Sequence, residues 1–296
     1  MSSSSILSLG IDGGASSAKW SLINANSEIL LQGKHQPIDG HLYRAESLER
    51  FTSFITTLKN DLGNLVPDVV TLGITGFGAG DKLREELSKA FPQAKLNLGN
   101  DVALAYHSAF EPGEGVYLYA GTGSIAVHID KSENEILVGG WGYLLGDEGG
   151  GYWIGRESVR HLLSQIESHE QLDDLSIRIA GELGGANWES IRSFVYSKDR
   201  SAIAALTPHV TASAAQNCSS ALQILESAAH HLSQLVGRIR EILKNQRLPL
   251  VFGGGIADTK VRDFLEKELG GDIPLNKADH SFTAAKLGLK NRHDHP

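Results

Sequence analysis

The chain has 296 residues, which is enough for two domains or for one large one. Its 27 Lys and Arg against 35 Asp and Glu give a net charge of −8 with His neutral, which argues against nucleic acid or an anionic membrane as a partner. The hydrophobic content of 41% indicates a globular core, and the lone cysteine, Cys218, excludes an internal disulfide and a cysteine-based zinc site. The first residues lack the basic and long apolar segments of a signal peptide, so we expect a cytoplasmic protein.

The first 110 residues predict an α/β pattern. Apolar strands are predicted at 6–12, 20–24, 29–31, 69–74 and 94–98, and helices at 45–62, 81–91 and 102–109. Because strands and helices alternate after residue 45, we expect a sheet that is at least partly parallel.

The pattern restarts near residue 115. A strand over 115–120 runs into a glycine turn, and a returning strand follows over 125–129, repeating the opening plan roughly a hundred residues downstream. We interpret this as an internal duplication with two related domains, 1–110 and 111–280, and the last helix, about 281–296, could return to the first domain. Later elements are predicted as helices at 152–166, 258–269 and 281–290 and a strand at 248–252. A long apolar stripe over 221–242 is interpreted as domain core or as the surface of a homodimer.

The 33 glycines gather where predicted strands end. Glycine-rich turns follow four strands, at 12–14, 76–80, 121–123 and 253–255. Ligands of open α/β sheets bind at the carboxyl ends of strands, and glycine lets backbone N–H groups approach an anion closely. A single turn of this kind is more often a tight turn, but four together predict a polyphosphate site. The P-loop, the kinase His-Arg-Asp and the dinucleotide G-x-G-x-x-G patterns are absent.

These turns carry a resemblance to a known superfamily. Asp12-Gly13-Gly14, Gly121-Thr122-Gly123-Ser124 and Gly253-Gly254-Gly255 resemble the two phosphate loops and the adenosine loop of the actin/hexokinase/Hsp70 superfamily. The stretch from Gly139 to Trp153, with Gly-Trp-Gly followed by Gly-Asp-Glu-Gly, is similar to N-acetylglucosamine kinases of the BadF/BadG/BcrA/BcrD ATPase family. Other members of that family hold an iron–sulfur cluster through paired cysteines, which Cys218 alone cannot provide even in a symmetric dimer.

The resemblance implies a fold, a reaction and cofactors. The fold would be two actin-like (ribonuclease H-like) α/β domains, with mixed sheets flanked by helices and a cleft between the domains. The reaction would be ATP-dependent phosphorylation of an amino sugar, most simply N-acetylglucosamine to N-acetylglucosamine 6-phosphate, with ATP and Mg²⁺ as cofactors. Sugar and ATP would then be the partners, with no nucleic acid and no membrane, and a homodimer is compatible with the sequence.

The resemblance also implies roles for individual residues. Asp101, after a predicted strand, would be the catalytic base, although an aspartate there can also be a helix N-cap. Asp12 would hold Mg²⁺ through water. The alternative is that this aspartate, which precedes a glycine, stabilises the turn and has no role in metal binding. The residues expected to bind ATP are Gly13, Gly14, Ser16, Ser17, Lys19, Gly121, Thr122, Gly123, Ser124, Gly253, Gly254 and Gly255.

The expected sugar contacts come from several loops: Asp39, Gly76, Asn100, Asp101, Gly140, Trp141, Asp147 and Glu148. Asp147 and Glu148 are carboxylates suited to vicinal hydroxyls, although two acids in a loop can also only be solvated. The family expects an Asn after the third strand where this chain has Asp39, and its first loop has Ala15 and Ser16 in place of Gly and Thr.

Two other functions stay open. A glucosamine kinase would use an unpaired carboxylate near the substrate ammonium, for which Asp39 is a candidate. A non-catalytic, nucleotide-dependent regulator on the same fold would have no need of Asp101 beside a second sugar-binding acid, Asp147.

Overall fold

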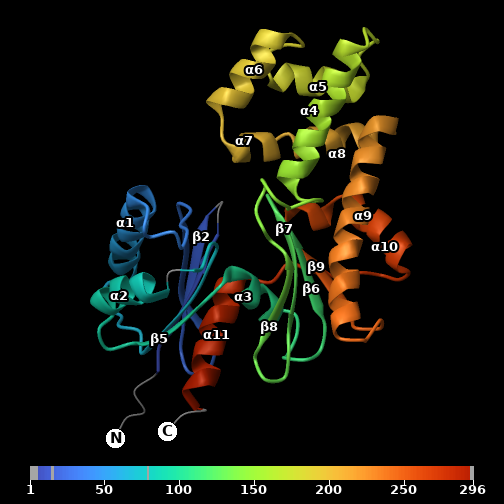
Figure 1. Ribbon diagram of the computed structural model, residues 1–296. Coiled ribbons are helices and arrows are strands. Elements are labelled where there is room, and N and C mark those ends of the chain that lie inside the picture. Colours follow the sequence, from blue (N-terminus) through green and yellow to red (C-terminus); the bar gives the residue numbers. More distant parts are fainter. Residues whose placement is uncertain (1–5, 15–16, 79, 294–296) are drawn as a thin grey trace, which may run out of the picture. The chain divides into compact units, whose positions relative to one another are not determined.

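The computed structural model describes residues 6–14, 17–78 and 80–293. The chain divides into two compact units: unit 1 is formed by the described residues up to Phe110 and from Ala278 onward, and unit 2 by Glu111–Lys277 (Figure 1). Among the described helices, none combines the length and the apolar character that a membrane span requires.

Unit 1 is built on a five-stranded mixed sheet in the order β3-β2-β1-β4-β5. Its strands are β1 (Ser8–Gly13), β2 (Ala18–Ile23), β3 (Ile29–His35), β4 (Val69–Ile74) and β5 (Lys95–Gly99). The first three strands form an antiparallel meander, and β1, β4 and β5 run parallel. The carboxyl ends of these three parallel strands therefore lie at one edge of the sheet, where Asp12 is in register with Gly73 and Gly73 with Gly99.

Helices cover the sheet of unit 1. They are α1 (Ala45–Leu62), α2 (Gly80–Ala90), α3 (Asp101–His107) and α11 (His280–His293). The bounds of α1 are those predicted, because Phe51, Phe54, Leu58 and Leu62 recur at helical spacing and are all buried.

The C-terminal helix α11 packs directly on β1 and β2. Ser8 Oγ donates to the carbonyl of Ala285 at 2.7 Å, and the hydroxyls of Ser21 and Ser281 are 2.8 Å apart. A side chain at Gly10 would collide with the backbone of Ser281 and Ala285. The contact therefore depends on small residues, which let the helix backbone approach the strand.

Unit 2 has a second five-stranded mixed sheet, in the order β10-β9-β6-β7-β8. Its strands are β6 (Val116–Ala120), β7 (Ser124–Ile129), β8 (Glu135–Gly139), β9 (Leu250–Gly253) and β10 (Leu275–Asn276). An antiparallel meander, β6-β7-β8, is followed outward by the parallel strands β9 and β10, so the sheet repeats the plan of unit 1. The predicted fold class, two α/β parts with mixed sheets and flanking helices, is confirmed.

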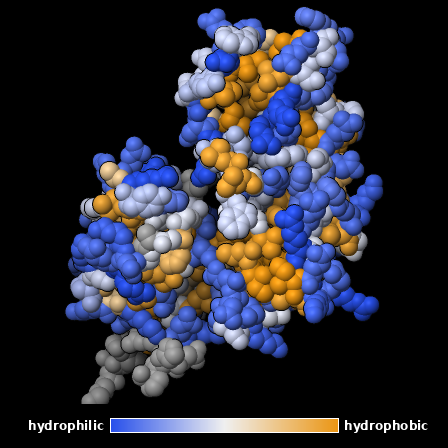
Figure 2. Space-filling model, in the orientation of Figure 1, coloured by the Kyte–Doolittle hydropathy of each residue, from blue (hydrophilic) through white to orange (hydrophobic). Residues whose placement is uncertain are grey.

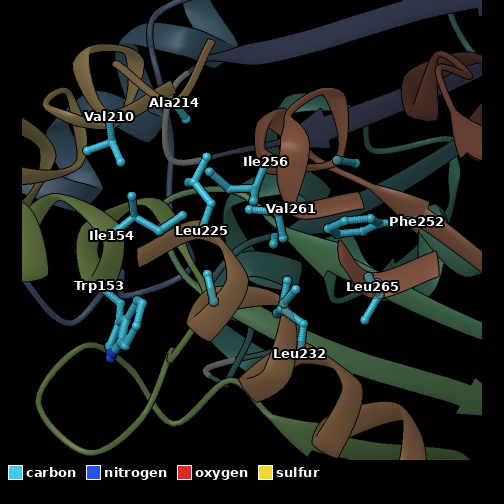
Figure 3. Close-up of a cluster of buried hydrophobic side chains, with 14 of the residues drawn as sticks. Trp153, Ile154, Val210, Ala214, Leu225, Leu232, Phe252, Ile256, Val261 and Leu265 are labelled. Carbon is cyan, nitrogen blue, oxygen red and sulfur yellow. The ribbon is translucent and has the colours of Figure 1, made fainter. Parts of the chain in front are cut away.

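Unit 2 has a larger set of helices. They are α4 (Gly151–Glu167), α5 (Asp174–Glu182), α6 (Trp188–Ser197), α7 (Arg200–Ala204), α8 (Thr207–Ala215), α9 (Ser219–Ile242), the 3-10 helix η1 (Gly255–Asp258) and α10 (Lys260–Leu269). Figure 3 shows side chains of α4, α9 and α10 pointing into one apolar cluster, among them Ile154, Leu225, Leu232, Val261 and Leu265, all completely buried. The apolar stripe over 221–242 is thus core on the side that carries Leu225 and Leu232. Apolar residues also gather on the face drawn in Figure 2, over the helices α4–α6.

Candidate functional site

Asp101 lies in the first turn of α3, directly after β5. The N-cap of this helix is Asn100, whose side-chain oxygen accepts a hydrogen bond from the Ala103 N–H at 2.6 Å. The alternative of Asp101 as the N-cap is therefore wrong. Asn100, which we predicted as a sugar contact, caps the helix instead. Burial raises the pKa of Asp101 to about 6, against the hydrogen bonds from its own N–H and that of Val102.

Asp12 lies at the same edge of the sheet, near the end of β1. Burial raises the pKa of Asp12 to about 7, and the negative charge of Asp101 adds to the rise, whereas Lys19 opposes it. Lys19 is the residue directly opposite Asp12 in the β1–β2 pair. Asp12 and Lys19, from the β1–β2 hairpin, and Asp101, from the start of α3, thus form one electrostatic group.

Two residues of this group were not predicted, Asp279 and His280. The negative charge of Asp279 also raises the pKa of Asp12, and His280 Nδ1 lies 3.8 Å from an Asp12 carboxylate oxygen. Asp279 Oδ1 accepts hydrogen bonds from the N–H and the hydroxyl of Ser281, at 2.9 and 2.6 Å. An aspartate just before a predicted helix is the sequence signal that could have found it.

Gly13 and Gly14 are the described part of the first glycine turn. Gly14 N donates to the carbonyl of Ser17 at 3.1 Å, and a side chain at Gly13 would press on Ile38 and Ile74. Ser16, an expected ATP contact, lies outside the described residues. Gly13, beside Asp12, therefore fits closely against β4 and the loop around residue 38.

The loop after β3 carries Asp39, the residue expected to contact sugar. Its Oδ1 lies 3.0 Å from His41 N and 3.1 Å from His41 Nδ1, and its Oδ2 accepts from Ser47 Oγ at 3.1 Å and Arg50 Nη2 at 2.6 Å. A carboxylate has about four acceptor positions, so these four contacts fill them. Burial would raise the pKa of Asp39, but the hydrogen bonds and Arg50 lower it on balance. Asp39 is not an unpaired carboxylate.

Gly76 lies beyond the carboxyl end of β4, next to this loop. It has φ of +69°, which favours glycine, and a Cβ there would lie 3.0 Å from His41 Nε2. Gly40 N donates to the carbonyl of Thr75 at 2.9 Å. The residues 39–41 and the turn at Gly76 therefore form one packed structure at the edge that carries Asp12.

In unit 2, the turn from Gly121 to Ser124 is joined to the start of α4. Gly151 N donates to the carbonyl of Gly121 at 2.7 Å, and Tyr152 N donates to that of Thr122 at 2.9 Å. The Ser124 hydroxyl donates to the carbonyl of Glu148 at 2.7 Å, so in this structure it ties the turn to the loop 139–150.

Asp147 lies against this turn. Its carboxylate accepts backbone hydrogen bonds from Ser124 and Gly142, and a side chain at Gly123 would collide with it. Burial raises the pKa of Asp147 despite these bonds, and the positive charge of Arg200 lowers it. The structure thus brings Asp147 to the predicted phosphate loop.

Arg200, at the start of α7, was not predicted, because it is distant in sequence from the glycine-rich stretch. Its Cζ lies 5.8 Å from the centre of the Tyr143 ring, which in turn packs edge-on against Tyr152 at 5.0 Å. The neighbouring Trp141 is 77% exposed, so it is available to a ligand and is not a packing anchor. Gly140, also expected at the sugar, packs against Ile125.

The third glycine turn lies beside the second. A side chain at Gly254 would collide with the carbonyl of Ala120, the last residue of β6. Gly253 ends β9 and Gly255 begins η1. The carboxyl ends of β6 and β9 therefore hold the two predicted nucleotide turns of unit 2 side by side.

The metal expectation rests on Asp12. Within the ranges that the structure describes, no group of three or more His, Cys, Asp or Glu side chains is arranged to hold a metal ion. The donor chemistry nevertheless fits Mg²⁺, which prefers oxygen ligands and keeps several waters, so it needs only one or two carboxylates. Burial and the neighbouring charge of Asp101 raise the pKa of Asp12, and a cation bound beside its carboxylate would offset both effects.

Two kinases match most of this chain in sequence. The chain is 26% identical to the N-acetylmuramic acid/N-acetylglucosamine kinase of Clostridium acetobutylicum, over 84% of each chain. It is also 26% identical to the N-acetyl-D-glucosamine kinase of Dictyostelium discoideum, over 96% of this chain and 98% of that one.

A solved structure from Porphyromonas gingivalis, a candidate N-acetylglucosamine kinase, matches 96% of this chain and 99% of its own with a TM-score of 0.78 and 21% identity, which shows a shared fold. This fold is the actin-like ATPase fold predicted from the glycine turns. Residues 9–284 match the BadF/BadG/BcrA/BcrD ATPase family, and the chain belongs to it.

Proposed function

We propose that the protein is an ATP-dependent sugar kinase that phosphorylates N-acetylglucosamine on its 6-hydroxyl. The observation that carries the proposal is the pair of buried carboxylates at the strand edge of unit 1, Asp12 and Asp101, with pKa values of about 7 and about 6. A general base works best when its pKa lies near the working pH, and burial has moved Asp101 toward that range. Both kinases reported above act on N-acetylglucosamine by name.

Each group has a task in phosphoryl transfer. Asp101 would accept a hydrogen bond from the sugar hydroxyl, orient it toward the γ-phosphate and take its proton late in the transfer. The backbone N–H groups of the turns at 13–14 and 121–124 would bind phosphate oxygens, and Lys19 would add positive charge. Asp12 would hold Mg²⁺, which when bound neutralises charge on the phosphates.

The sugar would be bound by the loop that carries Asp147 and Glu148. Carboxylates accept hydrogen bonds from hydroxyl groups, and the exposed Trp141 offers an apolar face to a sugar ring. The backbone bonds from Ser124 and Gly142 hold the Asp147 carboxylate in one orientation, which favours selective binding over a mobile contact.

The acceptor positions of the Asp39 carboxylate are occupied, which favours N-acetylglucosamine over glucosamine as the substrate. A glucosamine kinase would need a free carboxylate near the substrate ammonium, whereas both Asp39 oxygens already have partners, including Arg50. The non-catalytic regulator is disfavoured by Asp101, because a protein that only binds nucleotide has no use for a buried carboxylate whose charge is costly.

The test is coupled-enzyme detection of ADP with MgATP and N-acetylglucosamine, glucosamine or glucose. We expect ADP release to depend on N-acetylglucosamine and the product to carry its phosphate on O6 by ³¹P NMR. Release that does not depend on any sugar would contradict the proposal, and a preference for glucosamine would support the alternative kinase.

A further inference from the structure

His41 lies at the same edge of unit 1 as the predicted catalytic groups. Its ring covers Gly76, in the turn that follows β4, so closely that a Cβ at Gly76 would collide with Cε1, Nδ1 and Nε2 of the ring. Thr75 N donates to the carbonyl of Gly13 at 2.8 Å, which joins this turn to the first phosphate loop beside Asp12. The imidazole therefore lies against the turn at Gly76, which is one of the residues expected to contact the sugar.

Asp39 fixes the orientation of the His41 ring. An ionised Asp39 only accepts hydrogen bonds, so the 3.1 Å contact makes His41 Nδ1 the donor. Arg50 and Ser47, both on α1, hold the other Asp39 oxygen at 2.6 and 3.1 Å. Because Nδ1 carries the hydrogen, the neutral ring presents Nε2 as an acceptor.

The Nε2 atom is left for a ligand. Within residues 6–14, 17–78 and 80–293, no hydrogen bond to His41 Nε2 is formed, and the side chain is 40% exposed. The ring packs edge-on against Tyr43 at 5.8 Å, which supports its position without using the nitrogen. An aspartate that fixes a histidine so that the far nitrogen faces a ligand is a familiar arrangement for recognition of a hydrogen-bond donor.

We propose that His41, positioned by Asp39, is a specificity-determining residue whose Nε2 accepts a hydrogen bond from a hydroxyl or amide N–H group of the sugar. Asp39, the residue the sequence singles out, then acts through His41 and does not touch the sugar. This inference rests on the proposed sugar kinase function, and it deepens that function by naming the atom that selects the substrate.

The first test compares steady-state kinetics of wild type, His41→Ala and His41→Gln with N-acetylglucosamine and MgATP. Loss of one hydrogen bond predicts a rise of roughly tenfold in the sugar KM of His41→Ala with the ATP KM unchanged. His41→Gln should recover most of the affinity, because its amide oxygen can reach the position of Nε2. His209→Ala, which alters a histidine paired with Glu182 in unit 2, is the matched control and should leave both KM values unchanged.

The second test asks whether Asp39 acts through His41. Asp39→Asn can turn its amide group toward Nδ1, which would make Nε2 a donor, so it should raise the sugar KM about as much as His41→Ala. The double variant should be no worse than His41→Ala alone, because the two residues form one unit. Asp61→Asn, which changes the carboxylate paired with His35, is the matched control.

The third test identifies the sugar group that donates a hydrogen bond to His41 Nε2. Deoxy analogues of N-acetylglucosamine lacking the 3- or the 4-hydroxyl are compared, together with glucose, which lacks the amide. Wild type should lose affinity for the analogue without the contacted group, and His41→Ala should not discriminate against it.

The outcomes separate the two proposals. If wild type does not phosphorylate N-acetylglucosamine, the proposed function is overturned and this inference with it. If wild type is active while His41→Ala and His41→Gln keep its sugar KM, this inference alone is overturned. Additive effects of Asp39→Asn and His41→Ala would contradict the role given to Asp39.

Discussion

Asp101 combines two properties that pull in opposite directions. It lies where the proposed function needs a base, and burial there makes its negative charge unfavourable, which raises its pKa to about 6. The negative charge of Asp12 is unfavourable as well, because Asp12 is buried and is repelled by the charge of Asp101. Carboxylates kept at such a cost to the folded state are a common property of active sites.

Replacement of Asp101 by Asn should stabilise the protein at alkaline pH. Because the folded-state pKa is above the ordinary value, the carboxyl favours folding below that ordinary value, and this contribution is lost as pH rises through about 6. Asn stays neutral and can still accept the Val102 N–H bond. At pH 8, the free energy of unfolding of Asp101→Asn should therefore exceed that of wild type by on the order of 1–3 kcal/mol. Thermal unfolding should show this as a higher Tm for the variant.

The difference between these two proteins should shrink at pH 5, where the wild-type carboxyl is mostly protonated when folded. Equal Tm values at pH 8 would contradict the assigned cause, burial of a charged group.

Arg200 should control the ionisation of Asp147. Burial raises the pKa of Asp147, the charge of Arg200 lowers it, and Glu148 raises it again. In Arg200→Gln the pKa should rise further, so the acid limb of kcat/KM for the sugar should move to higher pH. Arg200→Lys keeps the charge and should stay closer to wild type.

The matched control for Arg200 is Arg156→Gln, since Arg156 pairs with Glu157 next to it on α4. The same pH profile for wild type and Arg200→Gln would show that Arg200 does not act on Asp147.

At the scale of elements, the joint between α11 and β1 is the feature that completes unit 1. The helix comes from the far end of the chain and carries Asp279 and His280 to the edge where Asp12 lies. The helix can approach the strand this closely chiefly because Gly10 has no side chain.

Gly10→Ala should therefore weaken this joint. The added Cβ would meet the backbone of Ser281 and Ala285, which cannot move away as a flexible side chain could. We expect a loss of about 1–3 kcal/mol in urea unfolding. Gly237→Ala is the control: this glycine lies inside α9 with no atom close to an added Cβ, so the change should stabilise by about 0.5–1 kcal/mol. If both variants lose similar stability, the close approach is not the reason.

The elements that could be predicted are those with long apolar periodicity. The helix α1 was found with its bounds because its buried residues repeat at helical spacing. The strands β8 and β10 were missed because β8 is a short edge strand that begins with Glu135 and β10 has only two residues, Leu275 and Asn276. The 3-10 helix η1 is not predicted, because its first residue, Gly255, belongs to the predicted glycine turn and its last, Asp258, to the predicted helix 258–269.

The site was predictable in part for similar reasons. Aspartates and glycines at strand ends give a local signal, which placed Asp12 and Asp101 at one edge. The filled state of Asp39 has no such signal, because it depends on Arg50 and Ser47 of the next helix reaching back. His280 and Arg200 join their groups only through tertiary packing.

On the scale of the whole molecule, the two sheets repeat one plan, in which an antiparallel meander continues into two parallel strands. Each unit carries its glycine turns at the carboxyl ends of equivalent strands, β1 and β6. Unit 1 holds Asp101 and His41, whereas unit 2 holds Asp147 and the glycine turns at 121–124 and 253–255, for which we predict nucleotide binding. The repeated scaffold therefore carries different side chains in its two copies.

Sugar binding without nucleotide should stabilise the whole protein. A ligand that binds only the folded state at 100 times its Kd adds about 2.7 kcal/mol, so the Tm should rise with N-acetylglucosamine alone. Glucosamine should give a smaller rise, because Asp39 has no free oxygen for an ammonium group. Stabilisation by ATP but by no sugar would favour the nucleotide-dependent regulator.

In the function we propose, this chain transfers phosphate to a sugar with Asp101 as the base. The most direct measurement is ADP release by wild type and Asp101→Asn, with MgATP and with or without N-acetylglucosamine, alongside the ATP affinity of both. We predict sugar-dependent release by wild type, a loss of at least about two decades in kcat for the variant, and nearly equal ATP affinity. Sugar-independent release, or an Asp101→Asn variant that keeps wild-type turnover, would contradict the account.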